Sequence, residues 1–161
     1  MKSLLVLRHA KSSWKDPELA DHDRPLSKRG RRDAPRMGRL MRELSLLPEV
    51  VLCSTATRAQ STLGLALDAA DWSCERRFSP ALYTASPDDI VALLRELPGR
   101  VGRVLVVGHN PALEELVREL TGKEVALPTG ALARLDWRGD EWGDFGAAGT
   151  VELAQLWMPK Q

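Results

Sequence analysis

Two cationic side chains, Arg8 and His9, follow directly where the apolar run of residues 4–7 stops. A strand that packs on both faces is apolar throughout, so a pair of cations at its end is placed for something other than packing. Both groups can bind an anion, and an imidazole can also act as a base or a nucleophile. The pair therefore indicates an anion site at the end of a strand.

Two later segments repeat this arrangement. The apolar run of residues 50–53 is followed within a few residues by Arg58, and the run of residues 104–107 is followed by His109. Because ligands of open α/β sheets bind beyond the carboxyl ends of the strands, we expect these side chains to converge with the first pair. Helices that begin just after these strands would add their positive N-terminal dipoles to the same crevice. The sequence therefore predicts one phosphate-sized anion site.

This set of side chains fits phosphoryl transfer. The guanidinium forks of Arg8 and Arg58 match phosphate oxygens and can hold them while charge redistributes. A histidine beside two guanidinium groups has its charged form disfavoured, so we expect it to be neutral at pH 7 and able to attack phosphorus. The other histidine can donate to a phosphoryl oxygen. These rules leave open whether His9 or His109 is the nucleophile.

Apolar runs and helical periodicities alternate along the chain and define the elements that must position these residues. This alternation, closed by two strands around a Gly- and Asp-rich turn, predicts a three-layer α/β/α domain with a mostly parallel sheet and an antiparallel edge. The expected strands are residues 2–7, 50–53, 76–82, 103–107, 131–137 and 151–157. The expected helices run from Ser27 to before Pro48, over residues 57–69, from Ser86 through Leu97, and from Asn110 to before Gly122.

Two prolines bear on the helix boundaries. Pro35 lies inside the first expected helix, where a missing hydrogen bond would kink the helix or make it restart. Pro111 is expected in the first position of the last helix, with Asn110 as its cap.

Three segments, residues 7–10 (LRHA), 54–59 (STATRA) and 108–111 (GHNP), together resemble the histidine phosphatase superfamily, also called the phosphoglycerate-mutase-like family. The order and spacing of the segments agree with that family. Its usual first motif is Arg-His-Gly, and Ala10 stands here at the glycine position. The resemblance covers most of the chain.

The resemblance implies a role for each residue of the anion site. His9 would be the nucleophile that becomes phosphorylated. Arg8 and Arg58 would hold the phosphate, and His109 would be the second histidine of the phosphate pocket.

Residues 23–30 (DRPLSKRG) and the short chain resemble one branch of the superfamily, the SixA-type phosphohistidine phosphatases. That branch removes phosphate from histidine on phosphotransfer proteins. The resemblance implies a phosphohistidine-bearing protein as substrate, and it makes Arg24 a further candidate for a phosphate or substrate contact.

Many members of the superfamily carry an acidic residue after the third strand, yet residues 79–84 (SPALYT) contain no carboxylate. The next acids, Asp88 and Asp89, are typical of a helix start. A general acid is worth roughly 10²–10⁴-fold and matters more for an alkoxide leaving group than for an imidazole. The segment therefore favours a phosphoramidate substrate, and its short connection predicts an open pocket.

Two other functions stay open. One is a phosphomonoesterase or mutase that acts on a small phosphometabolite, which predicts a carboxylate near the leaving atom. The other is a non-catalytic module that binds phosphate or a phosphoprotein, which predicts no turnover. Retention of both His9 and His109 argues against the second, since binding needs only the arginines.

Size and charge bound the remaining possibilities. The chain of 161 residues fits one domain, residues 1–161, and its 23 Lys and Arg nearly balance 22 Asp and Glu at a net charge of +1. No overall field attracts nucleic acid, and no apolar run approaches the roughly 20 residues that span a bilayer. The segment up to Arg8 is too short and too quickly charged for a signal peptide, and Cys53 and Cys74 lack disulfide-framework or metal spacing. We therefore expect a cytoplasmic protein with no nucleic-acid or membrane partner.

The residue inventory gives no reason to expect a metal or another cofactor. The three histidines have no paired ligand spacing, no carboxylate cluster accompanies them, and a Walker-type loop is missing from the sequence. Phosphate or a phosphorylated substrate is the expected ligand, and the oligomeric state stays open.

Other polar residues and aromatics have less specific readings. His22 is expected in an exposed loop, and Asp21 and Asp23 beside it are expected to serve the turn, with a distant proton-donor role left open. Trp14 shares the loop after His9 and could line the pocket wall. Arginines of the first helix form a basic face that is usually only solvated but could dock an acidic protein.

Overall fold

The computed structural model describes residues 1–147 and 149–159. Six strands form one sheet in the order β3-β2-β4-β1-β5-β6. The strands are β1 (Lys2–Arg8), β2 (Val50–Ser54), β3 (Glu75–Ser79), β4 (Arg103–Gly108), β5 (Leu132–Trp137) and β6 (Val151–Trp157). The helices are α1 (Lys28–Glu43), α2 (Thr57–Ala69), α3 (Pro87–Arg95) and α4 (Ala112–Thr121), with short 3₁₀ helices η1 (Asp21–Asp23), η2 (Pro80–Leu82) and η3 (Trp142–Asp144).

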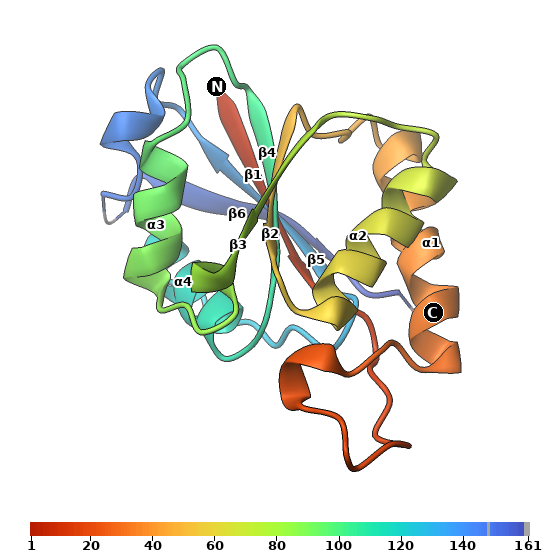
Figure 1. Ribbon diagram of the computed structural model, residues 1–161. Helices are drawn as coiled ribbons and strands as arrows, with labels where there is room; N and C mark the ends of the chain where they lie inside the picture. The colour runs from red at the N-terminus through yellow and green to blue at the C-terminus, as the bar shows by residue number, and fades with distance from the viewer. Residues whose placement is uncertain (148, 160–161) are drawn as a thin grey trace.

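The helices cover both faces of the sheet. Helices α1 and α2 lie on one face and α3 and α4 on the other (Figure 1). The pairs that join β1, β2, β3 and β4 are parallel, whereas β5 runs antiparallel to β1 and β6 antiparallel to β5. The predicted three-layer α/β/α arrangement with an antiparallel edge is confirmed.

Alternate residues of β1 enter two separate cores. Leu4 and Val6 belong to the core beneath α3 and α4, and Leu5 and Leu7 belong to the core beneath α1 and α2. This alternation follows from the period of two along a strand, and burial of both faces explains the continuous apolar run in the sequence. Each such side chain contributes about 1.5–3 kcal/mol when fully buried. Two cores on one rigid sheet hold the strand ends in fixed positions.

Side-chain caps start two helices where the sequence predicts them. The Ser27 hydroxyl accepts a hydrogen bond from the Gly30 amide at the start of α1. Ser86 and Asp89 form a reciprocal capping box at α3, so this carboxylate serves the helix start as expected. Helix α1 continues through Pro35 without a break, so the helix does not restart there.

Two of the boundaries that differ from the sequence prediction involve a proline. The third strand ends at Ser79, because Pro80 has no N–H for the sheet and the Ser79 hydroxyl instead accepts from the Ala81 amide to start η2. Helix α4 begins at Ala112, so Pro111 precedes the first turn instead of occupying it. The cap role of Asn110 is retained in part, since its Oδ1 accepts from the Glu114 amide at 3.3 Å.

The strand order places three carboxyl ends side by side, because β4 lies between β1 and β2. Arg8 at the end of β1 is in register with Gly108 at the end of β4. From this edge residues 9–26 make a long excursion, which Figure 1 shows below the sheet, before the chain enters α1. The two arms of the excursion are tied by a bridge between Ser12 and Leu26. In the part of the chain that the structure describes, no helix has the length and apolarity to cross a bilayer.

Candidate active site at the strand ends

The ends of β1 and β4 bring two histidines together. The His9 amide donates to the Gly108 carbonyl at 3.1 Å, which continues the β1–β4 pairing by one residue. The rings of His9 and His109 then lie with their centroids 5.1 Å apart and their planes at 51°. The predicted convergence of these two residues is therefore present in the fold.

The His9 ring is buried and has a defined tautomer. Its Nδ1 lies 2.7 Å from the Ala10 carbonyl oxygen, and a carbonyl can only accept, so Nδ1 carries the proton and Nε2 keeps its lone pair. Burial is the main cause that lowers the pKa of His9 to about 3, and the charges of His109, Arg58 and Arg8 act in the same direction. The arginines thus assist a neutral state that burial mainly produces. At pH 7 the ring is a neutral base with a free Nε2.

His109 presents a protonated ring nitrogen to the site, in contrast to the lone pair of His9. Its Nε2 lies 2.8 Å from the Ser54 hydroxyl, which already accepts from the Ala56 amide at 3.1 Å. Ser54 is fully buried and its hydroxyl proton has no other acceptor among the described residues, so that proton goes to Nε2 and Nδ1 of the neutral ring keeps its own proton. Burial, followed by the charge of Arg58, lowers the pKa of His109 to about 4. His109 is consequently a neutral N–H donor beside the lone pair of His9.

The two arginines of the site each have a buried Nε without a partner. Arg8 donates through Nη1 to the Leu127 carbonyl at 3.0 Å, and Arg58 donates through both Nη atoms to Asp21. Among the described residues, four buried side-chain polar atoms lack a hydrogen-bond partner, and three of them are Arg8 Nε, Arg58 Nε and His109 Nδ1. A buried donor left unpaired costs about 1–3 kcal/mol. Three such donors in one cluster indicate a site made for an anion.

Asp21, expected from the sequence to serve a turn, is a residue of the site. Its backbone carbonyl and Oδ2 accept from Arg58 at 2.7 and 3.0 Å, its Oδ1 accepts from Arg24 Nε at 3.1 Å, and its Oδ2 also accepts from the Tyr83 hydroxyl. The hydrogen bond from Tyr83 is the main reason that the pKa of Asp21 lies well below its usual range, and the two guanidinium groups add to it. Asp21 is therefore an ionised carboxylate that orients Arg58, and it is not a proton donor.

Arg24 supports the loop and Asp21. It is buried, and its Nη1 donates to the Ser12 hydroxyl at 2.8 Å and to the Ser13 carbonyl at 3.3 Å. The Trp14 ring covers its guanidinium at 3.4 Å from the ring centroid and is itself 71% exposed. Arg24 thus lies near the other site residues as predicted, but its side-chain hydrogen bonds go to Asp21, Ser12 and Ser13, so it stabilises the loop.

An aromatic rim stands over the histidines. The Tyr83 ring meets both His22 and His109 edge-on, with centroid separations of 4.8 and 5.5 Å. His22 was expected in an exposed loop, but it is half-buried here and its Nε2 lies 2.9 Å from the Thr55 hydroxyl. No motif around Tyr83 marks it as a site residue, because the fold of η2 and η1 alone brings it to Asp21.

The structure also bears on possible metal ligands and on the buried cysteine. Within residues 1–147 and 149–159, no group of three His, Cys, Asp or Glu side chains is placed to hold a metal ion. The expectation of a metal-free site stays a prediction. Cys53 lies fully buried in β2, where burial raises its pKa to about 12 and keeps it an uncharged core residue.

Similarity to known proteins identifies the family. Residues 4–82 match the model of the histidine phosphatase superfamily (branch 1). An uncharacterized protein of Mycobacterium tuberculosis is 37% identical over 166 residues, which cover 96% of this chain and 100% of that protein. A 2,3-bisphosphoglycerate-dependent phosphoglycerate mutase of a Nocardioides species is 46% identical over 79 residues, which cover 47% of this chain and 32% of the mutase. The solved structure of the putative phosphohistidine phosphatase SixA from Nakamurella multipartitia superposes with a TM-score of 0.86 at 30% identity, and the match covers 98% of this chain and 96% of that one. This chain belongs to the histidine phosphatase superfamily, and its structure is SixA-like.

Proposed function

We propose that this protein is a metal-independent phosphatase that works through a phosphohistidine at His9 and removes phosphate from histidine on another protein. One observation carries the proposal: a buried imidazole lone pair lies in one cluster with three buried N–H donors that have no partner among the described residues. A phosphoryl group has electrophilic phosphorus for the lone pair and oxygens for the donors. The similarity to SixA proteins supports the same chemistry.

The mechanism assigns each group one task. Arg8 and Arg58 bind phosphoryl oxygens through their free Nε atoms, so that Arg58 keeps its bonds to Asp21. His9 Nε2 attacks phosphorus in line, and a new P–N bond forms as the P–N bond of the substrate breaks. The His109 Nδ1–H donates to a phosphoryl oxygen and offsets the charge that develops there. Water then attacks phospho-His9, which releases phosphate and restores the neutral ring.

The leaving group decides between substrate classes. A phosphoimidazole that carries a proton on its free nitrogen leaves as neutral imidazole and needs no acid from the enzyme. An alkoxide does need one. Asp21 is a carboxylate whose charge acts on His109, and hydrogen bonds from Tyr83 and two arginines keep it ionised. The site therefore favours phosphoramidates over phosphoesters.

A direct assay tests the proposal. A phosphohistidine-bearing protein, p-nitrophenyl phosphate and 3-phosphoglycerate are each incubated in EDTA with wild type and with His9→Ala, and phosphate release is followed. We expect the highest kcat/KM with the phosphohistidine protein, no turnover by His9→Ala, and a base-stable, acid-labile phosphate on wild-type His9. Loss of activity in EDTA, or activity that survives His9→Ala, would contradict the mechanism.

The same assay addresses two other functions. A phosphomonoesterase or mutase is favoured by the local identity to the Nocardioides enzyme, and it predicts preference for the small esters. A non-catalytic phosphate-binding module predicts phosphate binding without turnover of any of the three compounds. The free Nε2 of His9 argues against that module. Its lone pair cannot donate a hydrogen bond to a phosphate oxygen, but it can attack the phosphorus of a phosphoryl group.

A further inference from the structure

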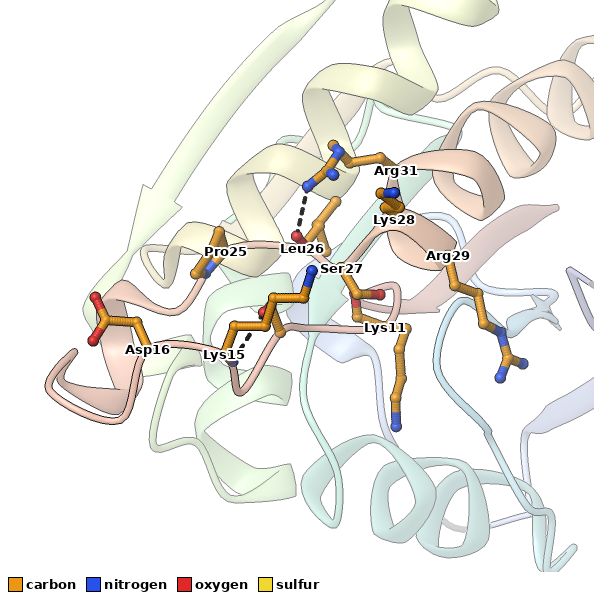
Figure 2. Close-up of a pocket in the computed structure, with 10 residues that line it drawn as sticks. Lys11, Lys15, Asp16, Pro25, Leu26, Ser27, Lys28, Arg29 and Arg31 are labelled. Atoms are coloured by element: carbon orange, nitrogen blue, oxygen red, sulfur yellow. Dashed lines mark hydrogen bonds between the residues drawn. The ribbon is translucent and has the colours of Figure 1, made fainter.

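A groove of about 580 Å³ lies between the loop that follows His9 and the start of α1. Its cations come from both sides: Lys11 and Lys15 from the loop, and Lys28, Arg29 and Arg31 from the first turn of α1 (Figure 2). Asp16 is the one acidic residue of its lining. Five cations against one acid stand out in a chain whose net charge is only +1.

Three of these cations are not neutralised. Lys11, Lys15 and Lys28 are exposed and form no ion pair with any described residue, whereas Arg29 pairs with Asp33 at 3.4 Å. Arg31 donates to the Leu26 carbonyl at 2.8 Å, which holds its guanidinium at the groove (Figure 2). The groove therefore carries a local positive field that the protein itself does not cancel.

The groove is built onto the segment that carries the nucleophile. Lys11 follows His9 by two residues, so at most about 7 Å of chain separates their Cα atoms. The Lys11 carbonyl accepts from the Ser27 amide at 2.9 Å and from the Ser27 hydroxyl at 3.1 Å. A Cβ on Gly30 would lie 2.1 Å from that same carbonyl, so only glycine lets α1 approach this closely. The wall of the groove that Lys11 forms is thus fixed relative to the segment that carries His9.

The type of cation indicates the type of ligand. A small anion is held by buried, converging donors, as at Arg8 and Arg58, whereas the groove offers flexible ammonium groups that stay in water. Exposed ion pairs are each worth about 1 kcal/mol or less, so such a surface gains affinity only when many charges act together. An acidic stretch of polypeptide supplies several carboxylates at once, and opposite fields also speed its encounter with the groove.

We propose that this groove binds an acidic segment of the substrate protein, the protein whose phosphohistidine reacts with His9. The inference rests on the proposed function and names the substrate class more closely: a phosphohistidine flanked by aspartate or glutamate. Cations on two sides of the groove orient that segment so that its phosphohistidine faces the strand ends.

Two synthetic phosphohistidine peptides test this, identical except that the flanking residues are glutamate in one and glutamine in the other. The readout is the ratio of their kcat/KM values, in which any general effect of a substitution on the chemistry cancels. We expect wild type to prefer the glutamate peptide by about tenfold and the preference to shrink as salt is raised. The variant Lys11→Gln/Lys15→Gln/Lys28→Gln should lose the preference.

A matched control removes three cations elsewhere. Arg118, Lys123 and Arg138 are exposed, and they lie at the end of α4 and beyond β5, whose last residue Trp137 pairs with Lys2 at the start of β1. The variant Arg118→Gln/Lys123→Gln/Arg138→Gln should keep the wild-type ratio. Equal rates of wild type on both peptides, or an equal loss in the control, would overturn the proposal.

Binding of the unphosphorylated peptides separates this inference from the proposed function. Fluorescence anisotropy should detect tighter binding of the glutamate peptide to wild type than to the groove variant, whatever the enzyme hydrolyses. Equal binding by the two proteins would overturn the groove while leaving the phosphatase intact. Selective binding without hydrolysis of either phosphopeptide would retain the groove and reject phosphohistidine as the substrate.

Discussion

The ionisation of His9 depends on a backbone group as well as on burial. The Ala10 carbonyl fixes the proton on Nδ1 and acts to raise the pKa, while burial of the ring lowers it further than the carbonyl raises it. Because the contact uses a main-chain oxygen, it does not depend on the side chain at position 10. This explains how alanine can stand where the family usually has glycine without disturbing the nucleophile. The Ala10 amide in turn donates to Thr62 on α2, which holds the segment in place.

Asp21 offers the sharpest test among single residues. The variant Asp21→Asn keeps the shape but removes the charge that orients Arg58, so we expect kcat/KM to fall by about tenfold, the equivalent of about 1.4 kcal/mol. A rise in KM should account for most of the loss, because the arginine contacts the phosphoryl group before and during transfer. Steady-state kinetics with a phosphohistidine peptide measures both constants.

Asp23→Asn is the matched control for this substitution. Asp23 belongs to the same short helix η1, but its exposed carboxylate faces His22 at 3.5 Å and does not reach the arginines. It should therefore have near wild-type kinetics. An equal effect of both variants would show that only the fold of η1 matters, and a faster Asp21→Asn enzyme would mean that the carboxylate competes with substrate for Arg58.

The sequence predicts where the strands end, but it does not predict the course of the connections between strands and helices. Arg8 follows an apolar run directly and His109 follows one after a single glycine, and parallel strands end at one edge, so sequence alone predicts that they meet. Asp21 and Tyr83 lie in connections whose course depends on tertiary contacts such as that of Arg24 with Ser12, and no local pattern encodes such contacts. The boundary at Pro80 was missed for a related reason, because the apolar residues after it resemble a continuing strand.

The close approach of α1 to α2 depends on one glycine. A Cβ on Gly38 would lie 1.8 Å from the Ala66 carbonyl oxygen, which is backbone and cannot move aside alone. We therefore expect Gly38→Ala to lower the free energy of unfolding by about 1–3 kcal/mol. Gly64→Ala is the control, because Gly64 lies inside α2 with open space around its Cβ position, and alanine there should stabilise the helix by up to about 1 kcal/mol. Urea unfolding followed by tryptophan fluorescence distinguishes the two, and equal stabilities would contradict the contact.

Across the whole molecule, charge is balanced in number but not in place. Lys and Arg exceed Asp and Glu by one, yet the edge of the sheet that holds His9 collects Arg8, Arg58 and the groove cations. Asp21 faces the histidines and is fully engaged by hydrogen bonds, and Asp16 is the one acidic residue of the groove lining. A field of one sign at one edge attracts phosphate and acidic polypeptide without making the protein basic overall.

Two buried neutral histidines also make the stability of the whole protein depend on pH. The pKa values of His9 and His109, about 3 and about 4, lie below the value of about 6.5 for an unfolded chain. Below pH 6.5 the unfolded chain therefore binds protons that the folded protein does not, so stability is complete above that pH and falls as the pH drops toward 4. From pH 7 to pH 5 each histidine should cost about 2 kcal/mol of unfolding free energy.

Urea unfolding at the two pH values, on wild type and on His9→Gln, measures this loss. Glutamine does not titrate, so the variant should lose about 2 kcal/mol less than wild type between pH 7 and pH 5, whatever its stability at pH 7. If His9→Gln loses as much stability as wild type, His9 takes up its proton equally in both states, and the neutral buried nucleophile on which the mechanism depends is excluded.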